Sequence, residues 1–174
     1  FSIFGSDYGF ATVGKVVSQL AAERASGVRF RFMLPNPLVV DDANNRLRSA
    51  DAMIIPHGFL TELPFLDLWQ DGWVAIVSAD NSRVGEKLTM DDLAELPFIM
   101  NYASRTAFTS ASRQIQQLGI EPRVDAVVES FLAMPHFIVG TDRVGLIQNA
   151  LLPSAVQMGG LRAVALPFAA TPLV

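Results

Sequence analysis

Short apolar runs rich in β-branched residues alternate with helical patterns along the whole 174-residue chain. This alternation is typical of an α/β protein, because strands that are followed by helices pair mostly in parallel. The runs predicted to be strands are 2–5, 28–34, 52–55, 73–79, 98–100, 124–128, 144–147 and 161–166. We therefore expect an α/β fold with mixed, largely parallel sheets.

The segments between these strands have the apolar spacing and the caps of helices. Helices are predicted over 12–24, after Asp41 or Asp42, from a cap at Thr89, over 104–118, and from near Ser130 and near Asn149. In the first of them, Val13, Val16, Val17 and Leu20 share one face. Residues 56–66 show neither pattern, and a new unit is expected to begin at Trp73.

Composition excludes several classes of protein. A hydrophobic content of 51% is enough for a well-filled core, but a net charge of −4 lacks the basic excess that binding to a phosphate backbone requires. Without cysteines the chain has no disulfides. No run of about 20 apolar residues could span a bilayer, and no signal peptide is evident. A soluble, cytoplasmic chain is expected, although a mature secreted protein could begin in the same way.

No enzyme signature is present: the sequence has no G-x-S-x-G, Walker loop, G-x-G-x-x-G or H-E-x-x-H motif. A metal site would have to use His57 or His136 with carboxylates at spacings that the sequence does not show. His136 is read as a packed or surface residue rather than a ligand contact. We expect neither an enzyme nor a bound cofactor or metal.

Ligands of open α/β sheets bind beyond the carboxyl ends of strands, and this rule selects the candidate site. Ser6, Asp7, Tyr8 and Gly9 follow the first strand, where backbone N–H groups can bind ligand oxygens. Alternatively, Ser6 or Asp7 only caps the next helix. The Asp7 carboxylate would repel an acid, which favours a phenolic or otherwise uncharged ligand. His57 follows the third strand, and the sequence leaves open whether it contacts a ligand.

Two further loops follow predicted strands in the second half of the chain. Asn101, Tyr102 and Ser104 come after 98–100, and Ser130 and Phe131 come after 124–128. The alternatives are an Asx turn for Asn101 and a core position for Phe131. Weaker candidates for an apolar lining are Phe10, Phe59 and Phe65, since aromatic residues lie more often in a core.

Three segments, in this order, resemble one family. Residues 130–145 (SFLAMPHFIVGTDRVG) fit the pattern S-F-x-x-x-P-x-x-[LIV]-x-G-T-[DE]-R-[IV], and 1–8 (FSIFGSDY) and 47–55 (LRSADAMII) fit two earlier elements. The pattern is similar to the effector-binding domain of LysR-type transcriptional regulators, in the branch that contains nodulation and aromatic-catabolism regulators. The resemblance covers almost the whole chain.

The resemblance implies a two-lobed, type 2 periplasmic-binding-protein-like fold. Lobe I would be 1–73, lobe II 74–168, and 169–174 the start of a crossover back to lobe I, whose closing element would be missing. A small, preferably aromatic effector would bind in the cleft between the lobes, with Asn101 and Phe131 as contacts by position. The protein would be a sensor and not an enzyme.

The same resemblance implies partners. The domain would form a homodimer in which the helix over 12–24 faces the partner's 104–118, and the full-length protein a homotetramer. Promoter DNA would be bound only through an N-terminal domain absent before Phe1, and RNA polymerase would be contacted by the full-length protein. Two alternatives remain: a transport-type solute-binding protein, which would be secreted and monomeric, and an enzyme on the same scaffold.

The net charge and the resemblance together generate a prediction about DNA. The isolated chain should show no specific operator binding at physiological salt, because operator readout needs a recognition helix and neutralised phosphates. An electrophoretic mobility-shift assay with promoter fragments checks this. A specific complex of nanomolar affinity would contradict it.

Overall fold

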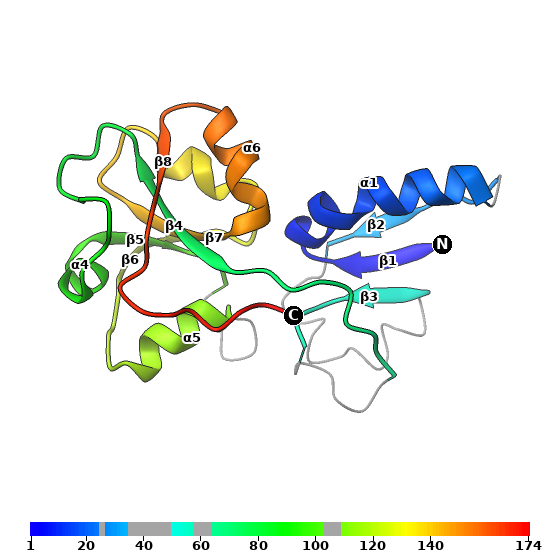
Figure 1. Ribbon diagram of the computed structural model, residues 1–174, viewed down its shortest axis with the longest axis horizontal. Helices are drawn as coiled ribbons and strands as arrows, with labels where there is room; N and C mark the ends of the chain where they lie inside the picture. The colour runs from blue at the N-terminus through cyan, green and yellow to red at the C-terminus, as the bar shows by residue number, and fades with distance from the viewer. Residues whose placement is uncertain (25–26, 35–49, 58–63, 103–108) are drawn as a thin grey trace. The chain divides into compact units, whose positions relative to one another are not determined.

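The computed structural model describes residues 1–24, 27–34, 50–57, 64–102 and 109–174 (Figure 1). They form two compact units, Phe1–Leu66 and Asp67–Val174. The sequence placed the lobe boundary near residue 73, whereas 67–72 belong to the second unit in the structure. Several predicted features lie outside the described residues: the helix after Asp41 or Asp42, residues 47–49 of the family resemblance, Phe59, Ser104, and the first part of the helix over 104–118.

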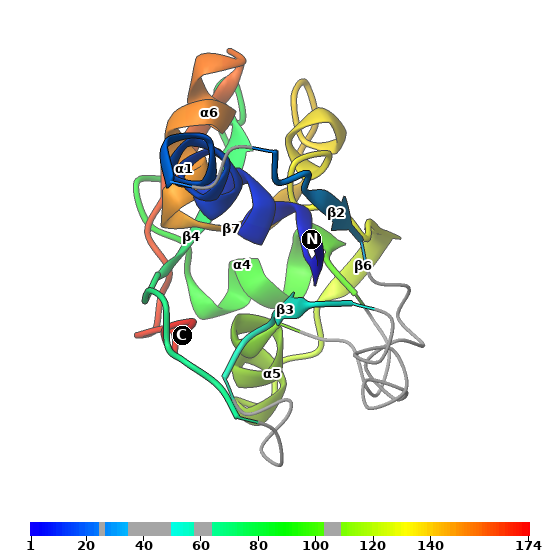
Figure 2. The same cartoon turned by 90° about the vertical axis from the view of Figure 1, so that its right-hand side faces the viewer.

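The first unit contains a three-stranded parallel sheet with β1 (Ser2–Gly5) between β2 (Arg31–Met33) and β3 (Ala52–Ile54). Helix α1 (Asp7–Arg24) lies along one face of the sheet, and Figure 2 views it nearly along its axis. Sequence placed the start of this helix at Thr12, which is wrong. The helix begins at Asp7 because the Ser6 hydroxyl accepts the Gly9 N–H at 3.2 Å and caps the first turn.

Helix α1 meets its sheet through glycines more than through its valines. A Cβ atom at Gly9 would lie 3.2 Å from Ile54 Cγ2, so the helix approaches β3 closely there. The stripe of valines and leucine predicted on one face is only partly covered, since Val16 is 52% and Leu20 43% exposed. The buried residues of α1 are Tyr8, Gly9 and Gly14.

The second unit contains a five-stranded mixed sheet of order β6-β5-β7-β4-β8. Its strands are β4 (Trp73–Ser78), β5 (Pro97–Met100), β6 (Arg123–Val127), β7 (Val144–Gln148) and β8 (Leu161–Val164). β5 runs parallel to β6 and β7, whereas β4 runs antiparallel to β7 and β8. The strand predicted over 161–166 ends early; the other four agree with the sequence to within about one residue at each end.

The helices of this unit are short. They are α4 (Met90–Glu95), α5 (Ser110–Gln117), the 3₁₀ turns η2 (Met134–Phe137) and η3 (Asn149–Leu151), and α6 (Leu152–Gln157). The predicted hydroxyl cap of α4 is confirmed: Thr89 Oγ1 accepts the Asp92 N–H at 3.0 Å, and Asp92 Oδ2 accepts the Thr89 N–H at 2.8 Å. The prediction of an α-helix from near Ser130 is wrong. The chain forms a turn there that leads into the 3₁₀ turn η2, with Pro135 in its first turn.

The C-terminal residues 169–173 run along α5. Gln114 Nε2 donates to the Ala169 carbonyl at 2.7 Å, and Gln114 Oε1 accepts the Thr171 N–H at 2.7 Å. Leu173 and Asp71 exchange two backbone hydrogen bonds of 2.8 Å. This segment, expected to begin a crossover back to lobe I, is bound to α5 and to the start of the second unit as far as Leu173.

Gly145 lets η2 approach the sheet. A Cβ atom there would lie 2.5 Å from Met134 Sδ and 2.7 Å from Ile138 Cδ1, and both of these side chains are at most 1% exposed. Gly145→Ala should therefore lower the free energy of unfolding by about 1–3 kcal/mol through overpacking. Urea denaturation followed by circular dichroism measures this change.

Gly85→Ala is the matched control, because a Cβ atom at Gly85 would meet nothing within 4 Å. Its free energy of unfolding should stay within about 0.5 kcal/mol of the parent value. Equal urea midpoints for Gly145→Ala and Gly85→Ala would contradict the close packing at β7.

Candidate functional site

The loops that follow β5 and β6 are joined side by side. Asn101 is 3% exposed, and its Nδ2 donates to the Val128 carbonyl at 3.0 Å. The Val128 N–H in turn donates to the Met100 carbonyl at 2.8 Å, which continues the β5–β6 pairing beyond the strands. Asn101 therefore holds the carboxyl ends of both parallel strands together.

Tyr102 adds further contacts between the two loops. Its hydroxyl donates to the Glu129 carbonyl at 3.3 Å, and its ring meets the ring of Phe131 edge-on with centroids 6.0 Å apart. Its backbone has φ of +54°, in the left-handed region that a residue with a Cβ atom rarely adopts. Tertiary contacts hold Tyr102 in this conformation, and strained backbone of this kind clusters at functional sites.

Phe131 is the middle of a row of three aromatic rings. It is 5% exposed, and its centroid is 6.1 Å from that of Trp73. Trp73 Nε1 donates to Ser110 Oγ at 3.0 Å, which joins the row to α5. Phe131 thus occupies the core position considered as its alternative role, and it also carries the contact to Tyr102. Trp73 was not predicted as part of the site.

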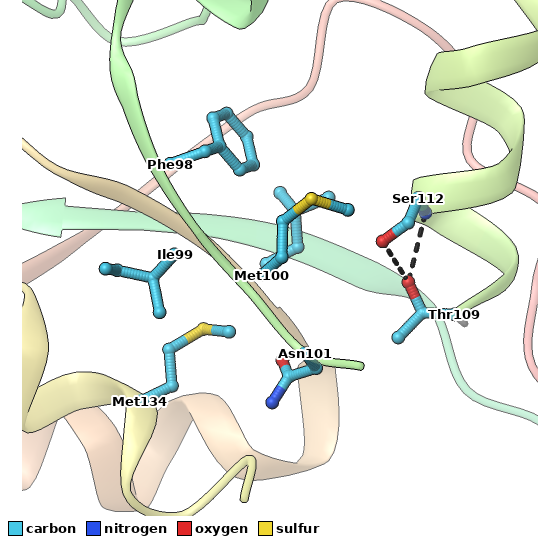
Figure 3. Close-up of a pocket in the computed structure, with 8 residues that line it drawn as sticks. Phe98, Ile99, Met100, Asn101, Thr109, Ser112 and Met134 are labelled. Carbon is cyan, nitrogen blue, oxygen red and sulfur yellow. Dashed lines mark hydrogen bonds between the residues drawn. The ribbon is translucent and has the colours of Figure 1, made fainter. Parts of the chain in front are cut away.

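A small pocket adjoins Asn101 (Figure 3). Its cavity volume is about 10 Å³, room for about one water molecule and far below the roughly 300–1,000 Å³ that is usual for drug-sized ligands. The lining residues are Phe98, Ile99, Met100, Asn101, Thr109, Ser112, Met134 and Leu146. In this form the pocket is too small for an aromatic ring, so it marks a position beside Asn101 and not a finished binding cavity.

Two hydroxyl groups give this mostly apolar pocket polar atoms. Thr109 Oγ1 accepts the Ser112 N–H at 3.0 Å and lies 2.6 Å from Ser112 Oγ, with both residues buried at the start of α5. Sequence reasoning missed both residues, although a Thr followed three positions later by Ser at the start of a helix is a readable cap pattern. Met134 and Leu146 carried no such signal.

The first candidate loop of the sequence, Ser6 to Gly9, lies in the first unit. Ser6 Oγ accepts the Gly9 N–H at 3.2 Å, and Asp7 Oδ1 accepts the Tyr8 N–H at 2.8 Å. Tyr8 is only 3% exposed. The capping role considered for Ser6 is therefore present, and two N–H groups of the first turn are already hydrogen-bonded within the turn.

The histidines lie at the surface. His57 is exposed after β3, and its ring lies 4.7 Å from the ring of Phe65, which is 57% exposed. His136 is exposed in η2. Phe10 is half-buried and packs on Phe32 at 5.0 Å. In the described part of the chain, no three His, Asp or Glu side chains gather as metal ligands would.

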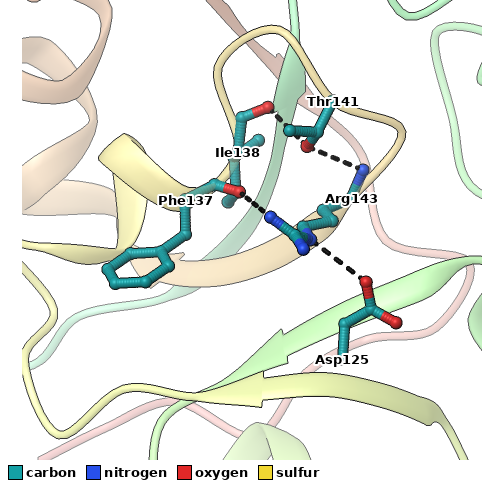
Figure 4. Close-up of polar contacts among 5 residues, drawn as sticks. All are labelled: Asp125, Phe137, Ile138, Thr141 and Arg143. Atoms are coloured by element: carbon teal, nitrogen blue, oxygen red, sulfur yellow. Dashed lines mark hydrogen bonds and ion pairs between the residues drawn. The ribbon is translucent and has the colours of Figure 1, made fainter.

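The G-T-D-R turn of residues 140–143 has a structural role (Figure 4). Thr141 Oγ1 donates to the Ile138 carbonyl at 2.8 Å and accepts the Arg143 N–H at 3.1 Å. Arg143 Nε donates to Asp125 Oδ2 at 3.1 Å, and its Nη1 donates to the Phe137 carbonyl at 3.3 Å. The arginine thus links β6 to the turn before β7.

Two units, each with an open α/β sheet, and the likeness of the chain to solved regulatory domains place it in the class of type 2 periplasmic-binding-protein-like folds. The chain belongs to the LysR substrate binding domain family, whose profile matches residues 41–173. The family resemblance and the fold class predicted from the sequence are both confirmed. No helix among the described residues is long and apolar enough to cross a membrane.

Curated relatives and solved structures agree with this assignment. The chain is 27% identical to nodulation protein D 2 of Rhizobium tropici, over 99% of this chain and 55% of that protein. The regulatory domain of MexT, a transcriptional activator in Pseudomonas aeruginosa, superposes with a TM-score of 0.70 at 20% identity, over 99% of this chain and 84% of that one.

A second solved structure is the effector-binding domain of QuiR in complex with shikimate. Its TM-score is 0.75 at 16% identity, over 99% of this chain and 82% of that one, and at this identity the likeness shows the fold alone. The chain spans about half the length of the curated relatives that it matches.

Proposed function

We propose that this LysR-type effector-binding domain senses a small molecule, with an aromatic, phenolic compound preferred, at the carboxyl ends of β5 and β6. The residues that would bind it in the second unit are Asn101, Tyr102 and Phe131. Ser6, Asp7, Tyr8, Gly9 and His57 are proposed as contacts from the first unit. The effector-binding domain of QuiR, which shares the fold, was solved in complex with shikimate.

The observation that carries this proposal is a hydrogen-bonding amide beside a pocket and an aromatic row. Asn101 lines the pocket, and its Oδ1 accepts no hydrogen bond from the residues that the structure describes. Two rings of the Trp73–Phe131–Tyr102 row lie on the same loops, and Trp73 begins β4. Few polar groups in mostly apolar surroundings are typical of a site that orients a small ring by one or two hydrogen bonds.

The proposed polarity of the effector follows from charge. Asp7 is half-buried at the start of α1, and a carboxylate there would repel an acidic ligand. A phenol or another uncharged compound with a hydroxyl group would avoid this repulsion. We therefore favour a neutral hydrogen-bonding aromatic over an aromatic acid.

Regulation would follow from a difference in the affinity of the effector for two arrangements of the protein. An effector that binds one arrangement of the protein more tightly shifts the population toward it by that difference in free energy. We propose that this domain forms a homodimer and the full-length protein a homotetramer. The population shift would change the conformation of this assembly, and thereby its contacts with promoter DNA and RNA polymerase. The exposed Val16 and Leu20 on α1 would support pairing through that helix.

A thermal-shift screen of aromatic and organic-acid metabolites tests the proposal. A ligand at about 100 times its Kd adds about 2.7 kcal/mol to the free energy of unfolding, so a true effector should raise the Tm clearly. Neutral phenolic compounds should predominate among the hits. A screen in which no aromatic compound raises the Tm would contradict the proposed effector class.

For a hit of that screen, Asn101→Ala should weaken binding by about 1–3 kcal/mol, because a polar group of the ligand loses its partner. Isothermal titration calorimetry measures this, with circular dichroism to show that the variant is folded. Gln117→Ala, an exposed change at the end of α5, is the control and should bind as the parent does. Unchanged affinity in Asn101→Ala would assign Asn101 to joining the two loops only.

A further inference from the structure

Gln148, at the end of β7, has a buried side-chain oxygen that finds no partner among the described residues. It is 1% exposed, and its Oε1 is buried and accepts no hydrogen bond among the described residues. Leu146, two positions earlier on the strand, and Trp73, which pairs with Gln148 on β4, are both buried. A buried polar group is normally hydrogen-bonded, so an unpartnered one requires an explanation.

The strand register places Gln148 at the same edge of the sheet as the candidate site. Ile99 of β5 pairs with Gly145 of β7 in parallel, so β7 ends on the side where β5 leads into Asn101. Side chains alternate along a strand, so Gln148 shares a face with Leu146, which lines the pocket. Directly opposite Gln148 on β4 is Trp73, the first ring of the aromatic row.

The choice of residue is informative because Leu would fit the same apolar surroundings without the penalty of burying an amide. An amide offers both a donor and an acceptor, so a hydroxyl group can pair with it in either orientation of the side chain. Nothing in the sequence separates Gln148 from an ordinary strand end, and only its burial and its register reveal it.

We propose that Gln148 is a specificity-determining residue of this domain, whose side-chain amide hydrogen-bonds a hydroxyl group of the aromatic effector. This inference rests on the proposed function, because it assumes that the effector binds at this edge of the sheet. Gln148 selects compounds with a hydroxyl group over apolar compounds of the same shape. The unpartnered Oε1 then lowers the stability of the free protein, and a hydroxyl group of the effector that donates to it removes this penalty.

The first test needs no ligand. Gln148→Leu should be at least as stable as the parent chain in urea denaturation, because it removes a buried oxygen that has no partner among the described residues. A clear fall in the urea midpoint would show that the amide has a structural partner, and would overturn the inference whatever the effector is. Gln117→Leu, at an exposed position, controls for the change in side chain.

The second test uses NMR titrations of the ¹⁵N-labelled chain with phenol and toluene, two rings of similar shape in which the hydroxyl group of phenol replaces the methyl group of toluene. In the parent, both should shift the Trp73 indole N–H signal, and phenol should bind about tenfold more tightly and also shift the Gln148 side-chain amide. In Gln148→Leu the phenol affinity should fall to that of toluene. Gln117→Leu should keep the parent preference.

The outcomes separate the two proposals. If neither phenol nor toluene shifts the signals of Trp73 or Asn101, the proposed aromatic site fails, and the role of Gln148 fails with it. If both bind but Gln148→Leu keeps the preference for phenol, only the role of Gln148 is overturned.

Discussion

The parallel register of β6, β5 and β7 is the constraint on which the site depends. Backbone pairing sets Met100 of β5 beside Val127 of β6, and Ile99 beside Gly145 of β7, so all three strands end at one edge. The loops that follow can then meet, as the hydrogen bond from Asn101 to the Val128 carbonyl shows. The antiparallel strand β4 begins at this edge and brings Trp73 to it.

Much of this arrangement could be predicted from the sequence, because it depends on local patterns. Runs of β-branched residues predicted the strands of the second unit, and the Thr89 cap predicted the start of α4. The rule that ligands bind beyond the carboxyl ends of strands selected Asn101, Tyr102 and Phe131 as candidates. Helix α1 was predicted to start too late, since the valine spacing begins after Thr12, whereas the Ser6 cap starts it at Asp7.

The remainder depends on contacts between residues far apart in the sequence. The aromatic row joins Trp73 to Phe131, and neither ring carries a local signal of that contact. Gln148 ends an apolar strand, and its unpartnered state is a property of what surrounds it. The G-T-D-R run, which carried the family resemblance, joins β6 to the turn before β7 through Arg143 and Asp125. A motif can therefore identify a family through residues that hold its fold.

The central claim is that the effector binds at the carboxyl edge of β5, β6 and β7. A crystal structure of the chain with a compound that raises its Tm tests this claim most directly. The account predicts electron density for that compound against Asn101, Tyr102 and Phe131. Density confined to another surface of the second unit, or to the first unit alone, would contradict it.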